Sequence, residues 1–328
     1  MKKKDYSRRE FLKQNSLSGL GIIFAGSLPS HLVNAGFTSN YPLQAEPVID
    51  IHTHTNYGGR TNDELLAHQR AMGITTTILQ PAGRPVEYGS TYYGVANGLQ
   101  AKCSGNDACY QFSQEHPKEF LFGSNEVPDL PEAIEEIEKY LKMGAVVIGE
   151  CKFGVDCDSK EMQKIYELAQ KFNVPILMHW LYNMYNRGFE RFYTMLEKYP
   201  RVNFIGHSQT WWANVDKNLT DQNIMYPKTK KVTPGGLTDQ LLGKYPNMFG
   251  DLSAPSGLNF LTRDEDYART FLAKYQDKLL FGSDCHDAVG HGEDCVGAQI
   301  IAAIRRLSPS KKIERKLLYE NAKRLFRL

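Results

Sequence analysis

Two histidines, His52 and His54, stand one residue apart at the end of an apolar run that begins at Pro47. Side chains alternate faces along a β-strand, so Asp50, His52 and His54 are expected to point the same way. Neutral imidazole nitrogens are the commonest protein ligands for zinc-like ions. An isolated pair of this kind is as typical of a strand that ends in a polar loop as it is of a metal site. The pair becomes a candidate metal site because other strand ends carry metal-type ligands too.

Four further apolar runs end in residues that can bind a metal ion. These residues are Glu150, His179, His207 and Asp284. Any one of them alone is more often a satisfied core or loop residue, but five such strand ends together are improbable by chance. Three or four nitrogen and oxygen ligands leave a coordination position for water, whose pKa zinc lowers from 15.7 to about 7. The sequence therefore predicts a hydrolytic metal centre.

Apolar runs of strand type alternate with segments of helical periodicity from residue 47 onward, which is typical of βα units around a parallel sheet. The expected strands are 48–54, 74–80, 120–126, 145–150, 175–179, 202–207, 248–252 and 278–284. The expected helices are 62–72, 130–143, 159–172, 188–199, 237–245, 264–275, 298–307 and 311–326. Eight units favour a single-domain (β/α)8 TIM barrel, with a doubly wound sheet as the alternative. Barrel active sites lie at strand C-termini, where the candidate ligands fall.

Two connections, 81–117 and 208–238, are too long to be simple turns and are expected to overhang the active face. The candidate substrate-binding residues are Trp211, Trp212, Arg60 and His286. The two tryptophans could line an apolar substrate or pin their own loop. The arginine could clamp an anionic group, although surface arginines outnumber such clamps, and the histidine could contact substrate or lie in a solvated loop.

The complete ligand set resembles that of the amidohydrolase superfamily of metal-dependent TIM barrels. Its pattern is His-x-His on strand one, Lys or Glu on strand four, His on strands five and six, and Asp on strand eight. The ending Leu317-Leu318-Tyr319-Glu320-Asn321-Ala322-Lys323-Arg324-Leu325-Phe326 is similar to that of the broad hydrolase and decarboxylase branch. The resemblance implies one or two divalent ions, with zinc expected. The implied ligands are His52, His54 and Asp284 for one ion, His179 and His207 for a second, and Glu150 as the bridge.

Two activities follow from different roles of Glu150. The segment Gly149-Glu150-Cys151-Lys152 resembles strand four of TatD-type deoxyribonucleases, in which the glutamate bridges two metals. The first activity is a hydrolase, in which a metal-held hydroxide attacks an ester, lactone, amide or phosphoester of a small molecule while Asp284 relays the proton. The alternative is a mononuclear decarboxylase of a small unsaturated or aromatic acid, with His207 as acid and base. Glu150 would then orient a histidine, and a carboxylated Lys152 is a further alternative ligand.

The N-terminus matches a twin-arginine export signal at Ser7-Arg8-Arg9-Glu10-Phe11-Leu12-Lys13. The weakly apolar stretch 17–28 is shorter than the ~20 residues that span a bilayer, so no stable membrane anchor is expected. Small residues at 33–35 predict cleavage after Ala35. The expected organisation is a signal peptide, 1–35, and a barrel, 36–328. The twin-arginine machinery is the expected export partner, and the mature protein is expected to be periplasmic or exported.

Composition is that of an ordinary globular protein, with 41% hydrophobic and 23% charged residues. The net charge is +2, but the first 35 residues carry +4, so the remainder carries −2. A chain without a basic surplus is not expected to bind nucleic acid, and a small-molecule substrate is the expected partner. A homo-oligomer stays open. The six cysteines fit no familiar zinc spacing, and Cys103 and Cys109 are the expected pair if a disulfide forms.

Overall fold

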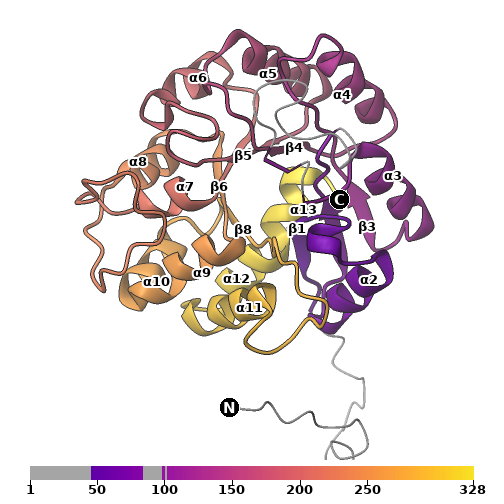
Figure 1. Cartoon of the computed structure of the whole chain (residues 1–328). Helices are drawn as coiled ribbons and strands as arrows, with labels where there is room; N and C mark the ends of the chain where they lie inside the picture. Colours follow the sequence, from indigo (N-terminus) through magenta and orange to yellow (C-terminus); the bar gives the residue numbers. More distant parts are fainter. Residues whose placement is uncertain (1–45, 84–97, 100–101) are drawn as a thin grey trace, which may run out of the picture. The chain divides into compact units, whose positions relative to one another are not determined.

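Eight short parallel strands alternate with helices along the chain (Figure 1). The computed structural model describes residues 46–83, 98–99 and 102–328. The strands are β1 Ile49–Thr53, β2 Thr76–Leu79, β3 Phe120–Phe122, β4 Ile148–Cys151, β5 Ile176–His179, β6 Phe204–His207, β7 Met248–Asp251 and β8 Leu279–Leu280. Each falls at one of the eight predicted positions. The predicted signal peptide, 1–35, lies outside the described residues and stays a prediction.

The strands pair in chain order, as β1-β2-β3 and as β4-β5-β6-β7-β8. Backbone hydrogen bonds also cross both seams between these two sheets. Val146 donates to the Phe122 carbonyl over 2.9 Å, and Ile51 donates to the Phe281 carbonyl over 3.2 Å. Strand number, direction and order are thus those of a (β/α)8 barrel, which confirms the predicted fold class.

Helices surround the strands (Figure 1). Their bounds are α2 Asn62–Ala71, α3 Asn106–Glu115, α4 Ala133–Lys142, α5 Lys160–Phe172, α6 Tyr193–Lys198, α7 Gln209–Ala213, α8 Leu237–Lys244, α9 Ala254–Arg263, α10 Glu265–Lys274, α11 Val296–Leu307, α12 Lys311–Arg315 and α13 Asn321–Phe326. Single turns or irregular helical segments occur at η1 Tyr57–Gly59, η2 Phe189–Arg191 and η3 Lys316–Glu320. Within the described residues, no helix is both long and apolar enough to cross a bilayer.

Helices α7 and α9 were not predicted from the sequence. The start of α9 reads as a loop because Pro255, Ser256 and Gly257 follow one another. Proline is tolerated in the first turn of a helix, where its missing N–H has no helical acceptor. Gly257 lies so close to the Leu252 backbone that a Cβ would stand about 2.0 Å from the Leu252 carbonyl oxygen. Close packing therefore accounts for the glycine that obscured this helix.

One apolar cluster joins most strands to the C-terminal helix. Its buried members are Ile49, Ile51, Ile78, Val147, Leu177, Ile205, Leu280, Ala322 and Phe326. The segment that carries the family-like ending also fixes β8 by hydrogen bonds. Asn321 is buried and donates to the carbonyls of Leu279, over 2.8 Å, and Gln276, over 2.7 Å. The C-terminal motif therefore positions the strand that precedes Asp284.

Candidate metal centre

The six predicted metal ligands lie together at the C-terminal ends of the strands. They are His52 and His54 at the end of β1, Glu150 on β4, His179 on β5, His207 on β6 and Asp284 after β8. All but Asp284 are buried, and the Asp284 side chain is 11% exposed. Because parallel strands of a barrel end on one face, residues separated by more than 200 positions meet there.

The candidate ligands form two overlapping groups of three, one of His52, His54 and Asp284 and the other of His52, Glu150 and His207. His52 Nε2 lies 3.2 Å from His54 Nε2, and Glu150 Oε2 lies 3.3 Å and 3.4 Å from these two nitrogens. Asp284 Oδ1 lies 3.4 Å from His54 Nε2 and 3.9 Å from His52 Nε2. Nitrogen and oxygen ligands about 2.0–2.2 Å from a tetrahedral zinc ion stand roughly 3.3–3.6 Å apart.

Asp284 Oδ1 is buried and has no hydrogen-bond partner among the described residues. A buried carboxylate oxygen without a donor is costly, and a bound cation would offset that cost. The donor set and this orphaned oxygen therefore fit a divalent cation.

Glu150 directs its second oxygen at a different pair of histidines. Oε1 lies 2.5 Å from His179 Nδ1 and 3.6 Å from His207 Nε2, and Asp284 Oδ2 also lies 3.6 Å from His207 Nε2. The His179 contact is a direct hydrogen bond, closer than two ligands of one ion would stand. The geometry thus offers one position with ligand spacing and an adjacent group that has the residues for a second.

Asp251, at the end of β7, completes the centre and was missed in the sequence. Its Oδ2 lies 2.7 Å from His52 Nδ1 and 3.3 Å from His207 Nδ1, and Ser253 Oγ donates to it over 2.6 Å. His54 Nδ1 lies 2.6 Å from the Gln80 carbonyl oxygen. With Nδ1 of each ring engaged, each Nε2 is left for the centre. The signal that could have found Asp251 is the same as for Asp284, a polar residue at a strand end.

The charges of the centre shift its pKa values strongly. Burial lowers the pKa of His52, but the charges of Asp284 and Glu150 outweigh burial and raise it to about 10. Burial raises the pKa of Glu150, but His179 and His52 outweigh it and hold that pKa well below its usual range. Burial also raises the pKa of Asp251, and hydrogen bonds with His207 and His52 outweigh it to give about 2. The metal-free centre therefore retains a proton on His52 at neutral pH.

Asp50 does not face the centre, although simple alternation predicted that it would share a face with the two histidines. The pairing of β1 with β2 changes register between Asp50 and Thr53, which breaks the alternation. Asp50 instead accepts hydrogen bonds from Gln69 Nε2, over 3.1 Å, and Ser283 Oγ, over 2.6 Å. It links α2 to the segment after β8 as a buried acceptor.

The two tryptophans lie in the core and line no open wall. Trp212 stacks on Phe260 with ring centroids 4.4 Å apart and donates from Nε1 to the Asp251 carbonyl over 2.9 Å. Trp211 packs on Gly206, where a Cβ would come about 2.5 Å from the indole ring. Both side chains are almost completely buried. Of the two roles considered, the structure places them as anchors of their segment.

Arg60 and His286 differ in what they can still contact. Arg60 is buried, and its guanidinium donates to the Asp287 carbonyl, Thr53 Oγ1 and the His54 carbonyl over 2.9 to 3.2 Å. These bonds engage both terminal nitrogens of the guanidinium. Arg60 therefore has no free pair of terminal N–H groups for the predicted contact with an anionic substrate. His286 is exposed, with its ring 5.7 Å from that of Tyr57, which in turn lies 5.1 Å from His54. His286 remains a candidate at the rim.

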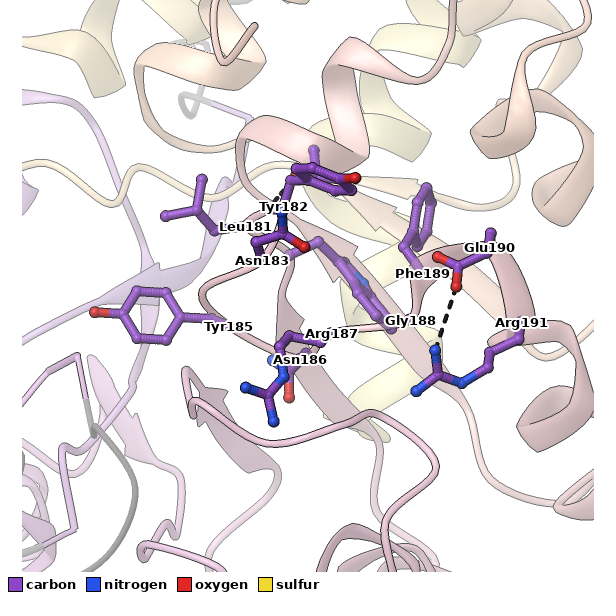
Figure 2. Close-up of a pocket in the computed structure, with 12 residues that line it drawn as sticks. Leu181, Tyr182, Asn183, Tyr185, Asn186, Arg187, Gly188, Phe189, Glu190 and Arg191 are labelled. Carbon is purple, nitrogen blue, oxygen red and sulfur yellow. Dashed lines mark hydrogen bonds and ion pairs between the residues drawn. The ribbon is translucent and has the colours of Figure 1, made fainter. Parts of the chain in front are cut away.

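A cavity of about 220 Å³ lies beside β5 and borders the centre through Tyr185, whose ring centroid is 5.7 Å from that of His179. Figure 2 shows Tyr185 on one side of the cavity and the Glu190–Arg191 ion pair on the other. Thr210 and Asn183 also line it. The segment after β5, to which the sequence pattern assigned no role, thus places the ring of Tyr185 beside His179.

All six cysteines are buried and free. The expected pair does not form a bond, because the two thiols have other neighbours. Cys103 Sγ donates to the Leu99 carbonyl over 3.4 Å, and Cys109 Sγ lies 3.5 Å from Thr55 Oγ1.

Comparison with known proteins supports an amidohydrolase-type barrel. A family model described as amidohydrolase matches residues 238–328, which include β7, β8 and the C-terminal helices. No curated protein sequence matches the chain. Solved structures share the fold across 86–87% of this chain and 98–100% of their own.

Three of these structures illustrate the range. An uncharacterised TIM-barrel protein from Bordetella bronchiseptica has a TM-score of 0.58 at 14% identity. A probable 2-pyrone-4,6-dicarboxylic acid hydrolase from Acinetobacter baumannii has 0.54 at 15% identity. The 5-carboxyvanillate decarboxylase of Sphingomonas paucimobilis has 0.53 at 12% identity. Both hydrolases and decarboxylases thus share this architecture.

Proposed function

We propose that the protein is a metal-dependent hydrolase that cleaves an ester, lactone, amide or phosphoester of a small molecule. The observation that carries the proposal is the position of Glu150. Its Oε2 lies 3.3 Å and 3.4 Å from the Nε2 atoms of His52 and His54, which is the spacing between two ligands of one ion. Its Oε1 faces His179 and His207. A carboxylate between two pairs of histidines could bind one ion and could also bridge that ion to a second one.

A divalent ion bound here would acidify water and polarise a substrate carbonyl or phosphoryl oxygen. His52, His54, Glu150 and Asp284 would hold it. Asp251 and Ser253 hold the rings of His52 and His207 through Nδ1.

Asp284 is placed to move a proton. Its Oδ1 has no donor among the described residues, and His52 and His207 hold its pKa well below the usual range against the effect of burial. It is therefore a carboxylate at neutral pH and can accept a proton from water and return it to the leaving group. His207 Nε2 lies 3.6 Å from Asp284 Oδ2, so a shift of a few tenths of an ångström would bring the two groups to hydrogen-bond distance for that exchange.

A decarboxylase is the second candidate. It is favoured by the direct hydrogen bond between His179 and Glu150, which as it stands leaves one position with ligand spacing. It is also favoured by similarity of fold to 5-carboxyvanillate decarboxylase. In this case His207 would protonate the carbon that loses carbon dioxide. Carbon dioxide release from small aromatic or unsaturated acids, without ester or lactone cleavage, would identify this activity.

The first experiment measures metal content per folded chain by elemental mass spectrometry, together with hydrolysis of an ester and lactone panel. The Glu150→Ala variant should lose at least one ion of the histidine–carboxylate centre and most turnover. Glu135→Gln, which changes an exposed glutamate on α4, is the matched control and should lose neither. Unchanged metal content and unchanged hydrolysis in Glu150→Ala would contradict the proposal.

We also propose that the twin-arginine machinery exports the protein to the periplasm. The Ser7-Arg8-Arg9-Glu10-Phe11-Leu12-Lys13 segment supports the proposal. Fractionation of cells that express the full chain should recover the mature protein, without residues 1–35, outside the cytoplasm. Replacing both Arg8 and Arg9 by lysine should retain the unprocessed chain in the cytoplasm, and export of that variant would contradict the proposal.

A further inference from the structure

A second cluster of metal-competent side chains lies outside the histidine–carboxylate centre. It consists of His68 on α2, Cys285 directly after Asp284, and Cys295 at the start of α11. All three are buried, at most 2% exposed. The two sulfur atoms lie 3.9 Å apart, and Cys295 Sγ lies 3.4 Å from His68 Nε2. Two cysteines that are ten residues apart thus meet a histidine that precedes them by more than 200 residues.

The spacing matches tetrahedral coordination by zinc. With Zn–S of about 2.3 Å and Zn–N of about 2.0–2.1 Å, two sulfur ligands stand roughly 3.8 Å apart, and a sulfur and a nitrogen roughly 3.6 Å apart. The observed separations of 3.9 Å and 3.4 Å differ from these values by about 0.1–0.2 Å. Thiolate and imidazole ligands are the set that structural zinc sites use.

Asp287 lies at the edge of this cluster and is not part of the group of three. Its Oδ2 lies 3.9 Å from His68 Nε2 and accepts backbone hydrogen bonds from Val289, over 3.0 Å, and Gly290, over 2.7 Å. These two bonds hold the carboxylate beside His68, and the three donors of the cluster are therefore the two sulfurs and the imidazole nitrogen.

The orientation of the His68 ring supports a ligand role. Its Nε2, the atom that would bind the ion, faces Cys295 and Asp287. Helix α2 is meanwhile well anchored, because Thr61 and Glu64 form a capping box at its start. The position of His68 is therefore set independently of the thiols.

We propose that His68, Cys285 and Cys295 form a structural zinc site that ties the segment after β8 to α2. The site is separate from the proposed catalytic centre, although Cys285 adjoins Asp284 in the chain. Because its three donors are buried and two of them are thiols, the ligand type of structural zinc sites, it would serve stability. Its effect on catalysis would be indirect, through the segment that carries Asp284 and His286.

The test uses cobalt as a spectroscopic probe on the mature protein, purified without added metal and reconstituted with Co²⁺. A thiolate-to-cobalt charge-transfer band in the near ultraviolet is expected. His54→Ala, which removes a ligand of the other centre, should keep this band. Cys295→Ser and His68→Gln should each lose it and should hold one zinc ion less per chain in the zinc-loaded form. Cys109→Ser changes a buried cysteine outside the cluster and should keep both.

Two results would overturn the proposal. One is cobalt bound to the wild-type protein with no thiolate band, which needs no variant and so does not depend on whether a variant folds. The other is a disulfide between Cys285 and Cys295, found by peptide mass analysis after alkylation of protein purified without reductant. Circular dichroism identifies any variant that fails to fold. The wild-type spectrum then decides the question.

Discussion

Asp284 and Cys285 are adjacent in the chain but belong to two clusters with different kinds of metal-binding side chains. Asp284 joins a group of imidazoles and carboxylates with one unpaired oxygen, beside a cavity that Tyr185 borders. Cys285 joins a buried group of two thiols and one imidazole. Nitrogen and oxygen ligands with an open position suit catalysis, whereas thiolate ligands are typical of structural zinc sites. Adjacent residues can therefore serve the two purposes on one barrel face.

The largest effect confined to the histidine–carboxylate centre is expected for Asp284→Asn. Asparagine keeps the shape of the side chain and tolerates the positive φ of 42° at this position, so the fold should persist. Loss of the carboxylate removes a metal ligand and the proton acceptor, and kcat should fall by at least about 100-fold. Steady-state kinetics and thermal unfolding measure the two effects, and the cobalt thiolate band should stay. Near-normal turnover would remove Asp284 from the mechanism.

The next largest effect is expected for Asp251→Asn, which leaves all six predicted ligands in place. Asparagine keeps one acceptor oxygen but loses the negative charge, and its NH2 group cannot accept a hydrogen bond from either Nδ1 of His52 or His207. Partners of this kind change metal affinity by roughly 10–100-fold when they are removed. Competition with a chelator measures the affinity. Asp266→Asn, at an exposed position on α10, should have no effect, and equal affinity in both variants would count against the role of Asp251.

The number of protons released when the ion binds should report whether His52 is protonated in the metal-free centre. The pKa of His52 is raised to about 10, so below that pH the ring carries a proton that the metal must displace. Burial lowers the pKa of His54, but Cys103 and Asp284 outweigh burial and raise that pKa well above its usual range as well. Affinity should therefore rise with pH by at least about tenfold per unit between about pH 7 and 9. Calorimetric titration in two buffers of different ionisation enthalpy counts the released protons, and the Cys285→Ser/Cys295→Ser double variant removes the contribution of the thiols. No release at neutral pH would show that His52 is neutral in the metal-free protein.

The smallest effect is expected for Trp212→Phe. Phenylalanine keeps an aromatic ring against Phe260 but leaves the Asp251 carbonyl without its donor. An unsatisfied buried acceptor together with the lost volume should lower the free energy of unfolding by about 2 kcal/mol. Denaturant unfolding measures this loss, and KM should not change. A raised KM with unchanged stability would instead indicate that Trp212 contacts the substrate.

Local patterns were enough to predict the barrel and the polar residues that end its strands. The eight apolar runs predicted eight strands because burial on both faces of a barrel strand leaves few other residue types. The ligands were recognisable because polar side chains are expensive in such strands and stand out at their ends. Helix α9 was missed for the converse reason, since its proline and glycine are accommodated by a first turn and a close contact that the pattern does not reveal.

The sequence by itself determined the fold class, the order of the units and the six polar residues that end the strands. Only the tertiary structure showed that Asp50 faces away from the histidines and that Asp251 holds two of them. It also placed Trp211 and Trp212 in the core, and it joined His68 to Cys285 and Cys295. Strand and helix periods report local burial, so they are legible along the chain. Which side chains share a point in space depends on register shifts and on contacts across more than 200 residues.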